Sequence, residues 1–559
     1  MTESSPWVFP LTIGQALRQV AARNGERDAV VCLQAGVRQS WAEFDAAVDG
    51  VAMGLLALEF QPGDHLGVWA TNWPEWVLLQ FACARIGVVL VTVNPAYQSS
   101  ELEYALQQSK MRGLALIDGF KQADFHRMLD EICPELTTSD PGRLQSQRLP
   151  HLKCVIRMRG REHPGMVNWQ QLIDAGRQVP VSELDSIEQR LSPVDPINLQ
   201  YTSGTTGRPK GALLTHRNLL LNGYYAARRQ QLTELDRICI PVPLYHCFGC
   251  VLGTICAAVT GAAMIFPFES FQSEATLTAI ETERCTAIYG VPTMFIAMLE
   301  HPTYAQRDTS SLRTGIMAGS PCPIELMKRV TQVMGAHQIT IGFGQTEASP
   351  LITTTCTDDT LEHRVGTVGT PLPGIEVRIV DPETRVSLPD GEPGELCCRG
   401  HNVMLGYYDQ PDLTAQSIDA DGWLYTGDMA VRQPDGYFRI TGRFKDMIIR
   451  GGENIAPREI EELLYQHPKI EDVQVVGVPD RKYGEEVAAW IKLRLGESAT
   501  EDEIRDYCRA RIAHFKAPRY IKFVDSFPTT VTGKIQKYKI REQAIIDLGL
   551  QAAAAIETA

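Results

Sequence analysis

The first 120 residues alternate between two hydrophobic patterns. Apolar side chains recur at helical spacing in residues 41–58 (WAEFDAAVDGVAMGLLAL) and in residues 75–87, which end at a glycine. Short, continuously apolar runs at residues 65–70 (HLGVWA) and 88–95 (VVLVTVNP) predict buried strands. Helices that alternate with buried strands predict an α/β fold with a largely parallel sheet. Residues 196–203 (PINLQYTS) continue this pattern as a further strand.

The pattern changes between residues 365 and 444. Short β-rich runs there are separated by Gly and Pro, as in residues 368–381 (VGTPLPGIEVRIVD). Such runs predict a smaller, twisted or barrel-like sheet attached to the main body. We place a domain boundary at Lys445, so that residues 1–444 form a large N-terminal domain.

Residues 445–559 are expected to form a small α+β domain. Pro457 stands at a helix start, with Ile460 and Leu464 on one face. A strand at residues 473–480 and a second helix at residues 501–515 follow.

Composition and charge exclude several classes of function. The 559 residues are 44% hydrophobic and 21% charged, which is typical of a globular protein of two to four domains. The net charge of −14 argues against a nucleic-acid partner. The longest apolar runs fall short of the roughly 20 residues that span a bilayer, and the N-terminus lacks the pattern of a secretory signal. We therefore expect no integral membrane segment and a cytoplasmic location.

The cysteines fit the same location. Fourteen are scattered without the spacing of a disulfide framework, as suits a reducing compartment. Cys247 and Cys250 form a C-x-x-C beside His246, but no second cysteine pair stands nearby to complete a zinc site.

The segment with the most specific chemistry is residues 201–211 (YTSGTTGRPKG). Its glycines let backbone N–H groups approach an anion, its hydroxyls donate further hydrogen bonds, and Lys210 supplies positive charge. It is not a Walker loop, because Lys210 follows a proline and the next residues predict a strand, not a helix. The segment predicts a phosphate-binding loop; the alternative is a surface linker.

This loop resembles the signature loop of the adenylate-forming acyl-CoA synthetases, a superfamily that includes peptide-synthetase adenylation domains and beetle luciferases. Further segments resemble other motifs of that family, in the same order and over nearly the whole chain. They are PLYHCFG (243–249), MAGSPCP (317–323), GFGQTE (342–347), YTGD (425–428), GRFKD (442–446), GGENIAPREIE (451–461) and PTTVTGK (528–534).

The resemblance implies a two-step reaction. A carboxylate attacks the α-phosphate of ATP to give an acyl-adenylate and diphosphate, and the thiol of coenzyme A then displaces AMP. It also implies a large domain of stacked parallel-type α/β sheets with a barrel-like subdomain, and a mobile C-terminal domain that rotates about Lys445. ATP, Mg²⁺ and coenzyme A are the implied cofactors and substrates.

The matching positions imply a set of catalytic residues. Lys534 would stabilise charge at the carboxylate and α-phosphate, Glu347 would bind Mg²⁺, and Thr346 would bond the α-phosphate. Lys210 belongs to the phosphate loop. His246 would lie near the carboxylate or the acyl entrance, or have a structural role.

The same matching implies residues that contact the nucleotide or coenzyme A. Asp428 and Arg443 would hold the ribose, Phe343 would stack on adenine in place of a tyrosine common in relatives, and Lys445 is the hinge. The full set is Thr202, Ser203, Gly204, Thr205, Thr206, Gly207, Lys210, Gly319, Ser320, Pro321, Gly342, Phe343, Gly344, Gln345, Thr346, Asp428, Arg443, Lys445, Gly451, Gly452, Glu453 and Lys534.

The acid substrate is less closely defined. Gly344 stands where acetate-activating relatives have a tryptophan, so we interpret it as leaving space for a longer acid. The N-terminal half looks most like bacterial medium- to long-chain fatty acyl-CoA synthetases, which favours a fatty acid. An aryl- or branched-acid ligase, an adenylation enzyme that serves a carrier protein, and a homodimer remain open. A non-catalytic nucleotide-binding protein is disfavoured, because the catalytic positions are intact.

Overall fold

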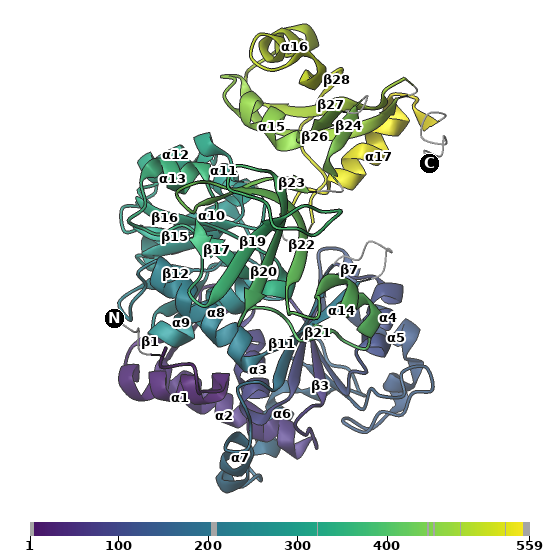
Figure 1. Cartoon of the computed structure of the whole chain (residues 1–559). Coiled ribbons are helices and arrows are strands. Elements are labelled where there is room, and N and C mark those ends of the chain that lie inside the picture. Colours follow the sequence, from purple (N-terminus) through teal and green to yellow (C-terminus); the bar gives the residue numbers. More distant parts are fainter. Residues whose placement is uncertain are drawn as a thin grey trace.

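The computed structural model describes residues 5–202, 209–320, 322–443, 446–450, 453–480, 482–530 and 533–551. For residues 443, 453 and 454 it describes the backbone alone. A large domain carries a smaller one on one end (Figure 1). The expected α/β fold with a small C-terminal domain is confirmed.

One sheet of the large domain contains the predicted strands of the N-terminal region. Its strands from β10 through β8 are parallel, and all residues of β3 and β4 are buried. In spatial order the sheet runs β21 (Gly406–Tyr407), β11 (Lys210–Thr215), β10 (Pro196–Thr202), β4 (Val89–Val93), β3 (His65–Trp69), β5 (Gly113–Leu116), β8 (Cys154–Arg157) and β9 (Val167–Asn168). Because both faces of such a sheet are covered, its strands are continuously apolar.

The second sheet is also mainly parallel, with antiparallel strands at both edges. It runs β18 (Thr370–Pro371), β17 (Leu351–Thr354), β16 (Gln338–Gly344), β15 (Thr314–Ala318), β14 (Ala287–Gly290), β12 (Arg237–Cys239), β13 (Ala263–Phe266), β1 (Asp28–Cys32) and β2 (Val37–Ser40).

Helices cover these two sheets. The predicted helix at residues 75–87 is α3, which begins at a proline, is buried along its whole length and ends at Gly87 with φ 73°. Gly87 therefore provides the left-handed residue that terminates it. The helices of this domain are α1 (Ile13–Asn24), α2 (Trp41–Ala57), α3 (Pro74–Ile86), α4 (Ser99–Gln108), α5 (Phe125–Ile132), α6 (Trp169–Gly176), α7 (Val181–Glu188), α8 (His216–Arg229), α9 (Thr254–Thr260), α10 (Ser273–Thr282), α11 (Pro292–Leu299), α12 (Ile324–Gln332) and α13 (Leu361–Gly366).

The β-rich region forms a separate four-stranded antiparallel sheet. Its strands are β19 (Ile375–Val380), β20 (Gly394–Gly400), β22 (Leu424–Arg432) and β23 (Phe438–Arg443), with α14 (Pro411–Ser417) between β20 and β22. The sheet begins about ten residues later than the sequence pattern indicated, because β18 pairs with β17 of the nine-stranded sheet.

The small domain has its own apolar clusters. The predicted strand is β26, and the predicted second helix is shorter than expected, because α16 ends at Arg509. Its elements are β24 (Ile448–Arg450), β25 (Glu453–Ile455), α15 (Pro457–Tyr465), β26 (Ile470–Asp480), β27 (Gly484–Leu493), α16 (Glu501–Arg509), β28 (Tyr520–Phe523) and α17 (Lys537–Asp547).

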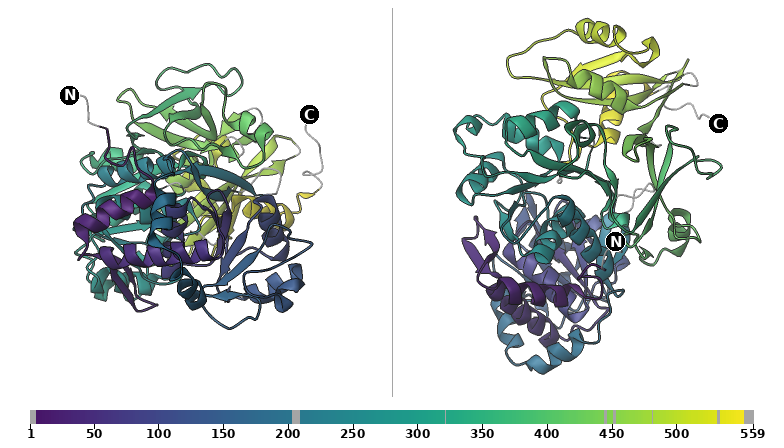
Figure 2. Two further views of the ribbon diagram at one scale, coloured as in Figure 1. Left: turned by 90° about the horizontal axis from the view of Figure 1, so that it is seen from below. Right: turned by 60° about the vertical axis from the view of Figure 1, so that its left-hand side comes forward.

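The two domains touch through α15 and through Arg494, the residue that follows β27. Figure 1 shows the small domain beside the end of the large domain where α11 and α12 are labelled, and the right-hand view of Figure 2 shows it again at that end. Arg458 Nη1 donates to the Ile440 carbonyl at 3.0 Å, and the Ile324 N–H lies 3.5 Å from Glu462 Oε2. An ion pair joins Arg494 to Glu300 at 3.7 Å.

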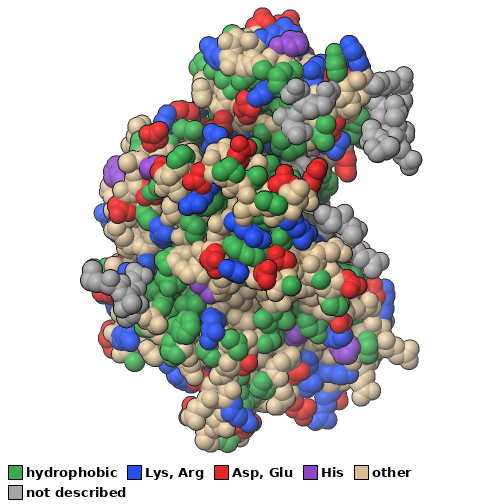
Figure 3. Space-filling view, viewed as in Figure 1, with side chains coloured by type: hydrophobic (Ala, Val, Ile, Leu, Met, Phe, Trp, Pro, Cys, Tyr) green, Lys and Arg blue, Asp and Glu red, His purple; other side chains and the backbone are tan. Residues whose placement is uncertain are grey.

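The surface is mixed in charge on the face drawn in Figure 3, where Lys and Arg side chains alternate with Asp and Glu. Among the described residues, every helix is too short or too polar to cross a membrane.

Candidate active site

The phosphate-type loop joins two antiparallel strands. Thr202 ends β10, Lys210 begins β11, and the two residues pair with each other. A strand therefore follows the loop, which confirms that it is not a Walker loop. Ser203, Gly204, Thr205, Thr206 and Gly207 lie outside the described residues.

A buried carboxylate faces the ends of this loop. Glu347 follows β16 in a short 3₁₀ turn (Thr346–Ala348) and is 9% exposed. The Thr202 hydroxyl donates to Glu347 Oε1 at 3.1 Å, and the Tyr407 hydroxyl donates to the same oxygen at 2.9 Å. The structure therefore brings together two predicted residues that are 145 positions apart.

Tyr407 was missed by the sequence analysis. Lys210 Nζ lies 3.5 Å from its hydroxyl oxygen and 4.7 Å from its ring centroid, so that one tyrosine contacts both Lys210 and Glu347. Burial, and next the charge of Glu347, raise the pKa of the Tyr407 hydroxyl, which keeps it a donor. In the sequence, Tyr407 is marked only by its aromatic side chain. The structure shows that it lies in the short strand β21 (Gly406–Tyr407), which pairs with β11.

The C-terminal lysine reaches the same part of the large domain. Lys534 Nζ lies 3.4 Å from His246 Nε2, although the two residues belong to different domains. His246 Nδ1 accepts a hydrogen bond from the Phe248 N–H at 3.1 Å. Burial, and then the charge of Lys534, hold the pKa of His246 well below its usual value. The ring is therefore neutral, and Nε2 is the ring nitrogen that faces the Lys534 ammonium.

The C-x-x-C beside His246 has a packing role in the structure. Cys247 Sγ lies 3.6 Å from both His246 Nδ1 and Thr346 Oγ1, and burial raises its pKa to about 11. Cys250 is fully buried and accepts a hydrogen bond from Gln200 Nε2 at 3.3 Å. Both side chains are free thiols.

The two adenine-type segments lie side by side. β15 and β16 are parallel neighbours with Ala318 opposite Gly342. Gly319 and Ser320 follow the carboxyl end of β15, Phe343 is the next-to-last residue of β16, and Gln345 follows β16. That edge is where open α/β sheets bind ligands. Pro321 lies outside the described residues.

The interpretation of Gly344 needs correction. A Cβ added there would lie 1.8 Å from the Pro350 carbonyl oxygen, because β17 approaches the backbone at this point. The position is constrained by its neighbouring strand, and it does not open empty space. Gly344 therefore gives no information about the length of the acid.

Asp428 and Arg443 face each other across two strands. Asp428 in β22 pairs with Arg443 in β23, and Asp428 is 4% exposed. Burial raises the pKa of Glu395 above its usual value, and the neighbouring charge of Asp428 acts in the same direction. The side chains of Arg443 and Glu453 are not described, and Lys445, Gly451 and Gly452 lie outside the described residues.

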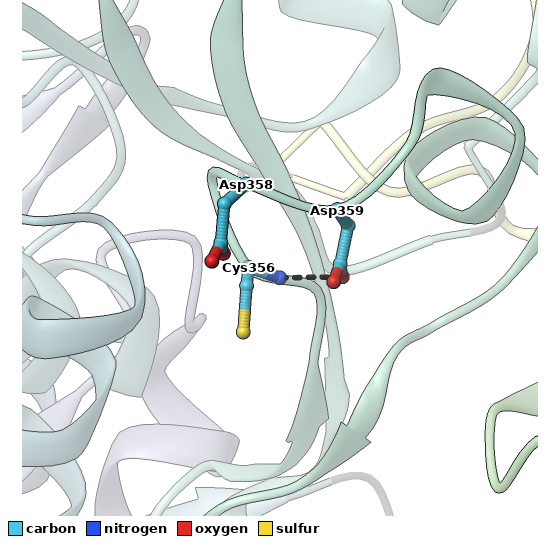
Figure 4. A group of neighbouring side chains, drawn as sticks. All are labelled: Cys356, Asp358 and Asp359. Atoms are coloured by element: carbon cyan, nitrogen blue, oxygen red, sulfur yellow. Dashed lines mark hydrogen bonds between the residues drawn. The ribbon is translucent and has the colours of Figure 1, made fainter.

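A second cluster of potential ligands follows β17 in the chain. Among the described residues, Cys356, Asp358 and Asp359 are the group whose atoms come close enough to hold a metal ion. Figure 4 shows the Cys356 backbone nitrogen facing the Asp359 carboxylate, a bond of 2.7 Å. Asp359 also accepts from the Tyr437 hydroxyl at 2.7 Å, and Cys356 Sγ contacts Arg229 at 2.5 Å. These bonds explain the cluster as a turn.

Comparison with known proteins decides the family. The model of the family described as "AMP-binding enzyme" matches residues 17–408, and that of the "AMP-binding enzyme C-terminal domain" matches residues 459–534. The chain belongs to the AMP-binding enzyme family. It is an AMP-forming acyl-CoA synthetase, and ATP and coenzyme A are substrates of such enzymes.

Relatives in this family cover almost the whole chain. YngI of Bacillus subtilis (strain 168), which carries the name of an acyl-CoA synthetase, is 51% identical over 534 residues, 96% of this chain and 97% of its own. The mitochondrial medium-chain acyl-CoA ligase ACSF2 of Danio rerio is 46% identical over 96% of this chain and 89% of its own. The crystal structure of the anthranilate CoA ligase AuaEII in complex with anthranoyl-AMP aligns with a TM-score of 0.84 and 26% identity, covering 97% of this chain and 98% of its own.

Proposed function

We propose that this enzyme converts a medium- or longer-chain fatty acid, ATP and coenzyme A into acyl-CoA, AMP and diphosphate through an acyl-adenylate. The observation that carries the proposal is the position of Lys534, whose ammonium reaches His246 of the other domain. Medium-chain relatives that cover 96% of the chain support the choice of acid.

The first half-reaction brings an anion to an anion. Two unit charges about 4 Å apart interact by ~4 kcal/mol at an effective dielectric constant of roughly 20. Lys534 Nζ and His246 Nε2 lie 3.4 Å apart, so a carboxylate oxygen that accepts from the Lys534 ammonium would also lie beside the His246 ring. Lys534 would hold the acid while its other oxygen attacks the α-phosphate, and would stabilise the charge that moves in that step.

Glu347 fits a role in binding Mg²⁺. Mg²⁺ is held in proteins by one or two carboxylates together with substrate phosphates, and Glu347 is a buried carboxylate beside the phosphate-type loop. The ion would neutralise phosphate charge when bound. Thr202 and Tyr407 orient the carboxylate by donating to Oε1. Lys210 places a positive charge next to the Tyr407 hydroxyl.

Asp428 would bind the ribose of the nucleotide. A carboxylate accepts two hydrogen bonds, which matches the 2′,3′-diol, and the paired backbone places Arg443 opposite.

The second half-reaction requires Lys534 to move away from His246. The polar contacts of Arg458 with Ile440 and of Arg494 with Glu300 would break as the small domain rotates, which would let the thiol of coenzyme A approach. Lys445 stays the predicted hinge. A cytoplasmic location and a homodimer also stay predictions.

The test is an acid series from acetate to long-chain fatty acids, with aromatic acids included. Diphosphate release is measured with and without coenzyme A, and acyl-CoA is identified by mass. We expect release that depends on the acid, a maximum of kcat/KM at medium or longer chains, and acyl-CoA only when the thiol is present.

Two outcomes would contradict the proposal. A clear preference for an aromatic acid would favour the activity named for the anthranilate CoA ligase, whose structure aligns well with this chain. A preference for acetate would show that the acyl site is short. The Lys534→Ala variant, run in parallel, controls for contaminating synthetases.

A further inference from the structure

Hydrogen bonds between Thr530, Gly533 and Lys534 close the turn that carries the lysine, and residues 531 and 532 lie outside the described part of the chain. The Thr530 N–H donates to the Lys534 carbonyl at 2.7 Å, and the Gly533 N–H donates to the Thr530 carbonyl at 3.0 Å. The Lys534 N–H donates to Thr530 Oγ1 at 3.1 Å. These bonds shape the turn, but its direction relative to the large domain must come from contacts across the interface.

One such contact reaches the residue before the lysine. Thr293, in the first turn of α11, donates its hydroxyl to the Gly533 carbonyl at 3.1 Å across 240 positions of sequence. Gly533 has φ 79°, and a Cβ there would lie 3.2 Å from both Thr293 Oγ1 and Val291 Cγ2. The turn therefore rests closely on the start of α11, and a glycine permits that approach.

The aliphatic part of the Lys534 side chain packs against the same surface of the large domain. A Cβ added at Gly319 would lie 3.3 Å from Lys534 Cε and 3.2 Å from Val291 Cγ1. Gly319 also has φ 88°, a conformation that disfavours other residues. Val291, Thr293 and Gly319 together form the surface of the large domain on which Gly533 and Lys534 rest.

We infer that Thr293 is a positioning residue for Lys534, which it aims by holding the Gly533 carbonyl. This inference rests on the proposed function, in which Lys534 acts in adenylation. A lysine side chain is flexible, so the position of its ammonium depends on where its backbone is fixed. A small displacement of a catalytic group from its productive geometry lowers the rate.

The role belongs to one state of the enzyme. The Thr293 hydroxyl and the Gly533 carbonyl lie on different domains, so the bond exists only while the small domain is docked as in this structure. Loss of the bond should slow adenylation and leave the transfer of a supplied acyl-adenylate to coenzyme A unchanged.

The experiment compares Thr293→Val, which keeps the shape and removes the donor, with Thr293→Ser, which keeps the donor. Because one hydrogen bond is lost, we expect Thr293→Val to lower kcat of adenylation by about 2- to 10-fold at an unchanged KM for ATP. Thr293→Ser should restore most of the rate. The matched control is Thr282→Val, which removes an exposed hydroxyl that bonds within α10 at 2.8 Å.

A double-mutant cycle separates positioning from a merely structural effect. If Thr293 acts through Lys534, then adding Thr293→Val to Lys534→Ala should not lower the adenylation rate further. A normal adenylation rate for Thr293→Val, or a full additional loss in the double variant, would overturn the inference. If Lys534→Ala itself adenylates normally, the proposed role of Lys534 fails, and that result is distinct from either outcome for Thr293.

Discussion

Tyr407→Phe isolates the hydroxyl that joins the phosphate-type loop to the proposed Mg²⁺ ligand. The variant keeps the ring, so Lys210 retains its contact at 4.7 Å from the centroid. It removes the donor to Glu347 Oε1 at 2.9 Å, together with the 3.5 Å contact between Lys210 Nζ and the hydroxyl oxygen. A hydrogen bond to a charged group contributes about 1.5–3 kcal/mol, which corresponds to roughly 10- to 150-fold in rate or affinity. Thr202 still donates to the same oxygen at 3.1 Å, so we expect the lower end, about tenfold.

The assay is acid-dependent exchange of diphosphate with ATP, measured over a range of Mg²⁺ concentrations. We expect the half-saturating Mg²⁺ concentration to rise and the exchange rate to fall, while transfer of a supplied acyl-adenylate to coenzyme A stays normal. Tyr408→Phe is the matched control, because its ring meets His65 at 4.9 Å and Lys110 at 5.9 Å and lies outside the Glu347 contacts. An unchanged Mg²⁺ dependence for Tyr407→Phe would refute this reasoning.

Two further predictions concern stability. Burial lowers the pKa of His216 to about 3. Between about pH 6.5 and 3 the His216 ring therefore binds a proton in the unfolded chain but not in the folded one, so the free energy of unfolding falls as the pH falls. His216→Asn retains an acceptor for the Ile13 N–H and removes the group that titrates. The free energy of unfolding should therefore fall by about 2 kcal/mol less between pH 7 and pH 5 than in the wild type, and the Tm difference between these pH values should be smaller. An equal Tm difference in both proteins would contradict this. Gly344→Ala should lower Tm, because its Cβ would lie 1.8 Å from the Pro350 oxygen and overpacking costs about 1–3 kcal/mol. A stable Gly344→Trp variant that prefers short acids would contradict this, because it would show that the neighbouring backbone leaves room for a side chain at residue 344.

The sequence allowed prediction of the elements whose pattern is local. The buried strands β3 and β4 and the helix α3 are apolar along their length, and a glycine ends α3. The segment after Lys210 was correctly expected to be a strand, which excluded a Walker loop. Motifs also indicated Thr202 and Glu347, which the fold brings into contact.

The residues that the sequence did not reveal depend on tertiary contacts. Tyr407 reaches Glu347 because β21 pairs with β11, and Thr293 reaches Gly533 because the small domain docks on α11. Neither contact leaves a periodic or local signal. Gly344 was misinterpreted for the same reason, since the strand that crowds it is found only in the folded structure.

The central claim is that Lys534 of the small domain acts beside His246 of the large domain during adenylation. The most direct measurement compares both half-reactions in the wild type and in Lys534→Ala. We predict that formation of the acyl-adenylate slows by roughly 10²- to 10³-fold, as for loss of one electrostatic donor, while conversion of supplied acyl-adenylate to acyl-CoA stays within about twofold of the wild type. Equal losses in both half-reactions, or a normal rate of adenylation, would contradict the account.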